Sequence, residues 1–465
     1  MKIHDLTDKK SLKILSLSFY ILVIGLLFLI IYNTFFVDFL LLIYRKPLHL
    51  SIFYFKSLVI LIILCLSFFG LSLKINYDKK LIILYIGYIC YGFLSVLFDK
   101  FYLAYPLKYS VYLFYRFYNL PILILLVSSL KINRNYNTNN YYDEVLSKKL
   151  FNLWLIVLFS LSLLILILNI AGHLYAKNIF QNITFNTIEK FGHTVIVFIN
   201  DTYYISIAII LLSILLFNKL KISAKILLSA VLLITIAVIY WTYLRTDYLG
   251  LILAVLSLLL LYFYKKYRYK NKAYKFIIYA LPGINLIIAI LAISLIVFLH
   301  IRGTKTINNS LSLFDRLHEW RFIVNKFIIN GNIINFLFGH GIIEYGFGKA
   351  PWRPDIPKLL HMKPYQLLFD NTYLQVILYN GVISLAFFLV LFIYIWKLLL
   401  KIFSIIPEDQ FYFYAYVLTI FASLPAMFMF DNFNSIYNIY AVIPAFLVLT
   451  AYHNKIKKCG NYNTL

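Results

Sequence analysis

The feature that most constrains this chain is a series of apolar runs, each about twenty residues long. A run of this length matches the hydrocarbon thickness of a bilayer when it folds as an α-helix. Of the 465 residues, 63% are hydrophobic and only 13% are charged, whereas a water-soluble domain is close to half apolar. The sequence therefore predicts an all-α, polytopic integral membrane protein that forms a single membrane domain over residues 1–465.

Hydropathy places twelve membrane spans, which we expect at 11–32, 51–73, 80–98, 108–130, 151–171, 202–217, 226–244, 247–264, 276–299, 373–396, 411–430 and 436–452. The formal net charge of +25 would suit a nucleic-acid binder, but topology explains it better. Lys and Arg concentrate in alternate connections, as cytoplasmic loops do. This pattern predicts that both termini are cytoplasmic and that nucleic acid is not a partner.

One long segment, residues 300–372, is neither a span nor a short connection. By the same alternation, it is expected on the outer face as a large periplasmic loop. The stretch from Asp315 to Arg321, followed by apolar residues, has the spacing of an amphipathic surface helix that ends near Asn330. Further along the loop, glycines at 339, 341, 346 and 348 permit tight turns and close backbone approach.

Two arginines lie within or at the end of predicted spans, where an ionisable side chain is costly and is expected to have a partner or a function. Arg116 falls inside the span at 108–130, roughly 12 Å from its outer end at 1.5 Å per residue. The Arg116 side chain either snorkels to the outer headgroups or pairs with a neighbouring helix, or it faces a cavity open to the outer leaflet. Arg245 lies at the turn between the spans at 226–244 and 247–264. It either pairs with Asp247 or holds a guanidinium at headgroup level, where paired donors match phosphate oxygens.

The order of several motifs around one outer loop resembles the O-antigen polymerase and O-antigen ligase family. The motifs are Arg245 after the seventh span, Arg316 followed by Trp320, Leu337-Phe-Gly-His-Gly341, and Asp370-Asn371-Thr-Tyr-Leu374, with Gly381 in the following span. The ligase branch usually has a His where Asp370 stands here, which favours the polymerase branch.

The resemblance implies a glycosyltransferase at the periplasmic face of the bacterial inner membrane. Its donor and acceptor would be undecaprenyl-diphosphate-linked oligosaccharides, and a chain-length regulator protein is a further candidate partner. Two alternatives stay open. One is a ligase that transfers polymer to the lipid A core; the other, of a different class, is a flippase or transporter of lipid-linked oligosaccharide, which would show paired halves and interrupted helices.

Independently of the resemblance, the residues of this chain suit a glycosyl transfer from a lipid diphosphate. Negative charge develops on the departing diphosphate, and fixed cations can neutralise it. The acceptor hydroxyl must also lose a proton to a carboxylate or His. We expect catalytic roles for Arg245, Arg316, Asp370 and Glu344, and substrate binding by Arg116, Arg302, Arg321, His340, His361 and Asn371. Asp370 and Asn371 could equally be a helix N-cap. No cluster of metal ligands is evident in the sequence, so no metal or other cofactor is expected.

Overall fold

The computed structural model describes residues 79–102, 187–190, 193–196, 202–218, 220–242, 245–266, 272–301, 317, 320–321, 323–340, 371–403 and 411–429. Five of the predicted spans lie outside these residues: 11–32, 51–73, 108–130, 151–171 and 436–452. The other seven coincide with helices.

These seven helices have the following bounds: α4 Lys79–Phe101, α7 Thr202–Phe217, α8 Ile222–Thr242, α9 Arg245–Lys266, α10 Lys272–Ile301, α13 Thr372–Phe403 and α14 Phe411–Met427. The described residues also include a π-helix, η3 Val324–Ile329, and a short helix, α12 Ile333–Phe338. One element departs from the all-α prediction. A two-stranded antiparallel hairpin pairs β1 Thr187–Lys190 with β2 His193–Ile196, with Thr187 opposite Ile196 and Lys190 opposite His193.

Apolar surface supports a membrane location for this helical protein. Among the described residues, four helices are long and apolar enough to cross a bilayer; they are the segments 83–101, 248–266, 275–295 and 372–401. Helix α8 exposes large apolar side chains along its length, including Ile222, Ile226, Leu227 and Leu233. An apolar face of this size is rare on a soluble monomer, and contact with lipid tails accounts for it.

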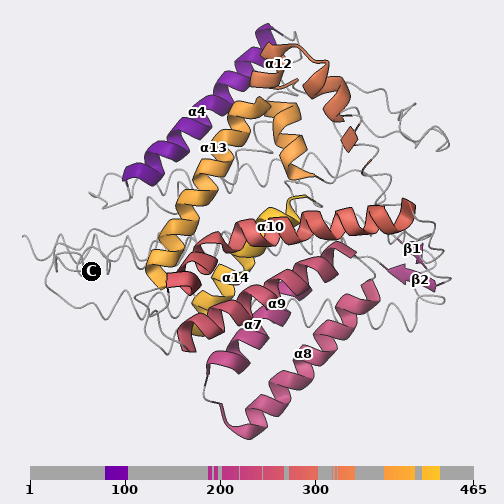
Figure 1. Cartoon of the computed structure of the whole chain (residues 1–465), viewed down its shortest axis with the longest axis vertical. Helices are drawn as coiled ribbons and strands as arrows, with labels where there is room; N and C mark the ends of the chain where they lie inside the picture. The colour runs from indigo at the N-terminus through magenta and orange to yellow at the C-terminus, as the bar shows by residue number, and fades with distance from the viewer. Residues whose placement is uncertain are drawn as a thin grey trace, which may run out of the picture.

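Two packed groups of helices are visible in Figure 1. In the first, α7, α8, α9, α10 and α14 lie together, with α14 against α7, α9 and α10. In the second, α4 and α12 pack against α13. An indole hydrogen bond from Trp396 of α13 to the Tyr279 carbonyl of α10, at 3.0 Å, joins the two groups.

Polar side chains hold the first group together from within. Asn285 of α10 is only 1% exposed, and its side-chain amide donates to the Ser257 hydroxyl of α9 and to the Ala422 carbonyl of α14, each at 2.9 Å. Ser213 of α7 donates to the Tyr412 carbonyl of α14 at 2.6 Å. Lipid cannot satisfy such groups, so a buried network of this kind fixes which helices become neighbours.

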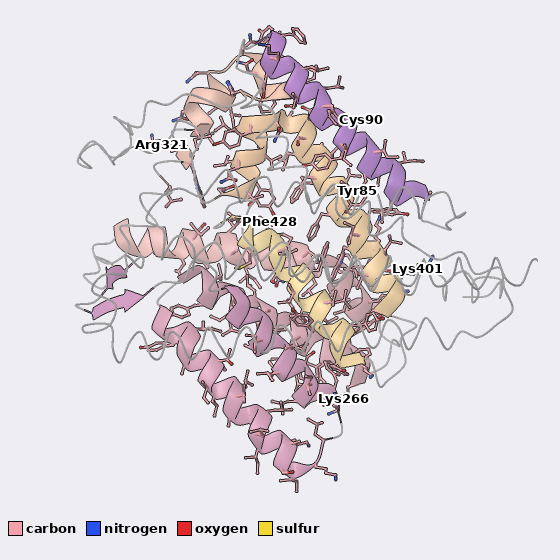
Figure 2. All side chains as sticks on the ribbon, turned by 180° about the vertical axis from the view of Figure 1, so that it is seen from behind. Tyr85, Cys90, Lys266, Arg321, Lys401 and Phe428 are labelled. Carbon is pink, nitrogen blue, oxygen red and sulfur yellow. The ribbon has the colours of Figure 1, made fainter. Side chains whose placement is uncertain are left out.

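One end of the molecule gathers the helix termini that the sequence predicts on the same side of the membrane. The Lys265 ammonium at the end of α9 lies 3.6 Å from the centre of the Phe411 ring, which begins α14. Phe411 also contacts the rings of Phe217, which ends α7, and Phe403, which ends α13. Figure 2 shows Lys266 and Lys401 toward this side and Arg321 at the opposite edge.

The prediction of one continuous span over 373–396 needs correction. Helix α13 is broken at Gly381, where φ is 78° and ψ is 172°. The two arms, 372–380 and 382–403, meet at a sharp bend beside α12 (Figure 1). A break inside an apolar helix leaves backbone carbonyls without their usual partners, which is tolerated only where other protein groups supply donors.

Candidate functional site: a break in helix α13 where three segments meet

The break in α13 is filled by the turn that follows α12. Gly339 has a φ of 94°, and a Cβ placed on it would come within 2.3 Å of the Tyr379 carbonyl oxygen. A Cβ on Gly381 would come within 2.0 Å of the Leu337 carbonyl oxygen. Only glycine combines this backbone conformation with such contact. The sequence predicts close backbone approach to a ligand here; the structure shows that the partner of Gly339 is the backbone of α13.

Donors from two distant segments satisfy the carbonyls at this crossing. The backbone N–H of His340 donates to the Leu378 carbonyl at 2.7 Å. The Tyr91 hydroxyl of α4 lies 2.7 Å from the Asn380 carbonyl oxygen and 3.1 Å from that of Leu337. A phenol has one proton to donate, so it serves these two carbonyls in turn. We call this meeting point of α4, α12 and the α13 break the junction.

A polar stripe on α4 faces the junction. Tyr91, Ser95 and Asp99 follow one another at intervals of four residues, so they share one face of the helix. Ser95 and Asp99 are 3% and 2% exposed. The Ser95 hydroxyl lies 3.5 Å from the Asn380 side-chain oxygen, and Asp99 lies about one helical turn beyond Ser95 on the same face. A carboxylate buried in an apolar helix is usually functional.

Aromatic rings attach α12 to the C-terminal part of the same helix. Phe338 of α12 stacks on Phe98 of α4 with ring centres 5.4 Å apart, and Phe98 stacks on Tyr102 at 4.7 Å. Asn332 caps α12 by accepting the Ile334 N–H at 3.0 Å. These contacts set α12 alongside α4 and bring His340 to the break.

His340 is the one predicted substrate-binding residue whose side chain is described at the junction. It is half-buried, and its Nδ1 lies 3.4 Å from the side-chain nitrogen of Asn335. Together with Ile323 and Leu378, both side chains line a narrow space that has no room for a water molecule. The residues around His340 are therefore closely packed.

Asn371 has the role of a helix cap. Its side-chain oxygen accepts the Leu374 N–H at 3.0 Å, and its backbone oxygen accepts the Gln375 N–H at 2.9 Å. The next N–H, that of Thr372, donates to the Phe428 carbonyl at the end of α14 at 2.8 Å. Asn371 is 5% exposed, so this side chain is used structurally, as the N-cap interpretation of the sequence anticipated.

The segment after Arg316 docks on the other group of helices. Leu317 and Trp320 pack against a cluster of buried residues from α9, α10 and α14, namely Leu253, Ala289, Ile293 and Ala426. Leu249, one helical turn after Arg245, packs on the same cluster. Ile323 is buried and Arg321 is exposed.

The remaining site predictions divide as follows. Arg245 begins α9, where a helix N-terminus adds partial positive charge, but its side chain is not described. Six predicted site residues lie outside the described residues: Arg116, Arg302, Arg316, Glu344, His361 and Asp370. The neighbours of Arg245 and Arg316 are described: Leu249, near Arg245, and Leu317, next to Arg316, pack on the same cluster.

Sequence reasoning missed the polar groups of the junction itself. Asp99 falls one residue beyond the predicted span 80–98, whereas α4 continues to Phe101. The i, i+4, i+8 spacing of Tyr91, Ser95 and Asp99 was the available signal. Asn380 precedes Gly381, and the Asn-Gly pair is a turn signal inside an apolar run.

No protein-family model matches this chain, and no curated protein matches it.

Proposed function

We propose that this protein is a metal-independent membrane glycosyltransferase that uses a lipid-diphosphate-linked oligosaccharide donor, and more specifically an O-antigen polymerase. It would act at the periplasmic face of the bacterial inner membrane. One observation supports this proposal above others: Leu249, next to the α9 terminus that begins with Arg245, and Leu317, next to Arg316, pack on one cluster. The two arginine-bearing segments therefore meet at one place.

This meeting place suits a diphosphate. The N-terminus of α9 contributes partial positive charge, and guanidinium groups offer paired donors to phosphate oxygens. The segment 317–340 lies away from the basic helix ends at Lys266 and Lys401 (Figure 2), as expected of a loop on the opposite side of a membrane.

In the proposed reaction, the hydroxyl oxygen of the acceptor sugar forms a bond to the anomeric carbon of the donor. The bond from that carbon to the diphosphate oxygen breaks, and its electron pair leaves with the lipid diphosphate, whose added charge the arginines stabilise. The acceptor proton passes to a base, for which Asp370, Glu344, His340 and His361 are the candidates.

Deletion of the gene tests the proposal through the surface polysaccharide. Loss of a polymerase leaves single repeat units on the lipid core. Loss of a ligase, the alternative within the family, leaves full-length polymer on its lipid carrier. Neither phenotype is expected if the protein has no role in surface polysaccharide.

Complementation with point variants then tests the arginines. Arg245→Ala and Arg316→Ala should each reduce elongation about 10²–10³-fold, the usual loss for one fixed charge-stabilising group, at unchanged protein level. Arg245→Lys should recover little, because an ammonium does not bind phosphate in the bidentate manner. Lys266→Ala removes a cation from the opposite end of α9 and serves as the matched control. Normal polymer from both arginine variants would refute the diphosphate assignment.

A flippase or transporter is a second candidate, and the break in α13 favours it. Interrupted helices are a recurring feature of transporter binding sites, and α13 is interrupted at Gly381. The location of the accumulated intermediate in the deletion strain discriminates between the two classes. Lipid-linked units accumulate at the cytoplasmic face when a flippase is lost and at the periplasmic face when a polymerase is lost.

A further inference from the structure

We propose that the short helix α12 and the turn before it lie in the bilayer itself, at the boundary between hydrocarbon and headgroups, on the side opposite the basic helix ends at Lys266 and Lys401. The partner of this surface is phospholipid. The residues that carry the inference are the exposed isoleucines Ile329, Ile333 and Ile334, which we call the isoleucine patch. The inference concerns a surface of the protein and holds whether or not the protein transfers sugar.

Helix α12 is apolar around its circumference, yet none of its residues is buried. Five of its six residues are apolar, in the order Ile-Ile-Asn-Phe-Leu-Phe. Ile333 is 71% exposed, Ile334 is 38% exposed, and Ile329 at the end of η3 is 67% exposed. A helix that is hydrophobic all round is stable in the core of a protein or in a membrane. The exposure of α12 excludes the first of these settings, so a membrane is the setting that suits it.

The isoleucine patch adjoins a surface of α4 that faces lipid if α4 spans the bilayer. Large apolar side chains are exposed along most of this helix, at Ile83, Ile86, Phe93, Leu94, Leu97 and Phe101. Helix α12 is attached at the C-terminal end of α4, where Phe338 stacks on Phe98 and the Asn332 side chain donates to the Tyr102 hydroxyl at 3.5 Å. Figure 1 shows α12 beside this end of α4. Lipid that covers α4 therefore reaches α12 without a gap.

The length of α4 sets the depth of the patch. The 23 residues of α4 extend roughly 34 Å at 1.5 Å per residue, slightly more than the hydrocarbon core of about 30 Å. When α4 crosses the bilayer, Phe101 and Tyr102 lie where hydrocarbon meets headgroups, and tyrosine is enriched at that level. The contact between Asn332 and Tyr102 brings the start of α12 to the same depth.

Polar residues beside the patch suit this depth as well. Asn330 and Asn332 are exposed next to the isoleucines, so amide groups can meet headgroups while the apolar side chains enter the acyl region. Lys100, in the last turn of α4, is also exposed. Its stem can lie along apolar surface while its ammonium reaches headgroup phosphates. The described stretch 323–340 contains no carboxylate that would oppose this contact.

The membrane contact of the loop is then made by a different stretch from the one that the sequence predicts. An amphipathic surface helix is expected from Asp315 to Arg321, but Leu317 and Trp320 of that stretch pack on α9, α10 and α14. The apolar side chains of that stretch are thus used within the protein. The isoleucine patch, by contrast, stays exposed.

The test measures the depth of a fluorescent probe in the full-length protein, reconstituted in phosphatidylcholine nanodiscs. In a background with Cys65, Cys90 and Cys459 changed to Ser, the variant Ile333→Cys is labelled with an environment-sensitive fluorophore. Three quenchers are compared: a lipid with a nitroxide near the headgroup, a lipid with a nitroxide near the end of the acyl chain, and iodide in the water.

Three positions of the chain provide matched references. Phe101→Cys marks the expected depth of the patch, at the end of α4. Leu94→Cys is exposed on the same helix and lies roughly 10 Å deeper at 1.5 Å per residue. Lys221→Cys is exposed just before α8 begins at Ile222 and marks access from water.

The Ile333→Cys probe should match the Phe101→Cys probe. The nitroxide near the headgroup should quench both more than the nitroxide at the chain end, the reverse of Leu94→Cys, and iodide should quench both less than Lys221→Cys. Without the fluorophore, the Ile333→Cys thiol should react about tenfold more slowly than Lys221→Cys with an impermeant maleimide, because only the thiolate reacts and apolar surroundings disfavour it.

Two results would overturn the proposal. Iodide quenching of Ile333→Cys equal to that of Lys221→Cys, without quenching by either lipid, would place the patch in water. Quenching by none of the three would show that protein covers the patch, whether a partner or a second copy of this chain. Ile329→Cys is a second variant from the same patch, for use where Ile333→Cys gives no monodisperse protein, and it should show the same order of quenching.

Discussion

Substitution of Gly381 by Ala tests the junction most directly. The new Cβ would lie 2.0 Å from the Leu337 carbonyl oxygen, a backbone atom that cannot rotate away, at a φ of 78°. With a ψ of 172°, this backbone conformation costs a residue other than glycine about 1–3 kcal/mol, and overpacking of this kind costs about 1–3 kcal/mol more. Gly381→Ala should therefore destabilise the protein by roughly 2–6 kcal/mol.

The chain supplies two matched controls. Gly283 lies within α10 and has open space where a Cβ would be, so Gly283→Ala should stabilise the helix by about 0.5–1 kcal/mol. A Cβ on Gly250 would meet the flexible Met427 side chain at 2.6 Å, which can move, so Gly250→Ala should fall between the other two.

The assay is the midpoint temperature for loss of monodisperse protein in detergent, measured by size-exclusion chromatography after heating. We expect the order Gly283→Ala, Gly250→Ala, Gly381→Ala from most to least stable. Gly339→Ala should lower the midpoint as Gly381→Ala does. The double variant should lower it by less than the sum of the two single effects, because both substitutions disrupt the same backbone contact. A midpoint for Gly381→Ala equal to that of Gly283→Ala would refute the described crossing.

Three further predictions use the same heating assay. Tyr91→Phe should destabilise the protein by about 1–3 kcal/mol, because the carbonyls of Leu337 and Asn380 lose their shared donor. An unchanged midpoint would mean that another donor replaces the Tyr91 hydroxyl. Asn371→Ala should cost about 1 kcal/mol through loss of the α13 cap, while Asn371→Ser should restore most of it, and equal midpoints for the two would argue against capping. Lys265→Met should cost about 0.5–1 kcal/mol by removing the cation over the Phe411 ring, and no change would show that this contact contributes nothing.

The helices of this protein could be predicted well because each depends on local composition. The predicted span 202–217 has the bounds of α7, and the span 247–264 differs from α9 by two residues at each end. Long apolar runs bounded by Lys or Tyr define such helices without reference to the rest of the chain. The expected end of the loop helix near Asn330 also holds, since Asn330 caps η3.

The break in α13 could not be predicted in the same way, because distant residues stabilise it. Tyr91 contacts the Asn380 carbonyl across 289 positions of the sequence, and His340 donates to Leu378 from the loop. Hydropathy treats 373–396 as uniformly apolar and is insensitive to a single φ of 78°. The sequence supplied only the hint of an Asn-Gly pair. For the same reason, the burial of Asp99 could not be predicted from the local sequence of α4.

The position of the junction bears on how the two groups of helices are connected. Leu317 and Trp320 pack on the cluster of α9, α10 and α14, while the His340 N–H donates to the Leu378 carbonyl at the α13 break. A connection fixed at two points transmits a displacement only where it is stiff between them. Helical structure covers Val324–Ile329, but η3 ends there and α12 begins only at Ile333. A displacement of α12 would therefore reach Trp320 only through the non-helical residues between these two helices.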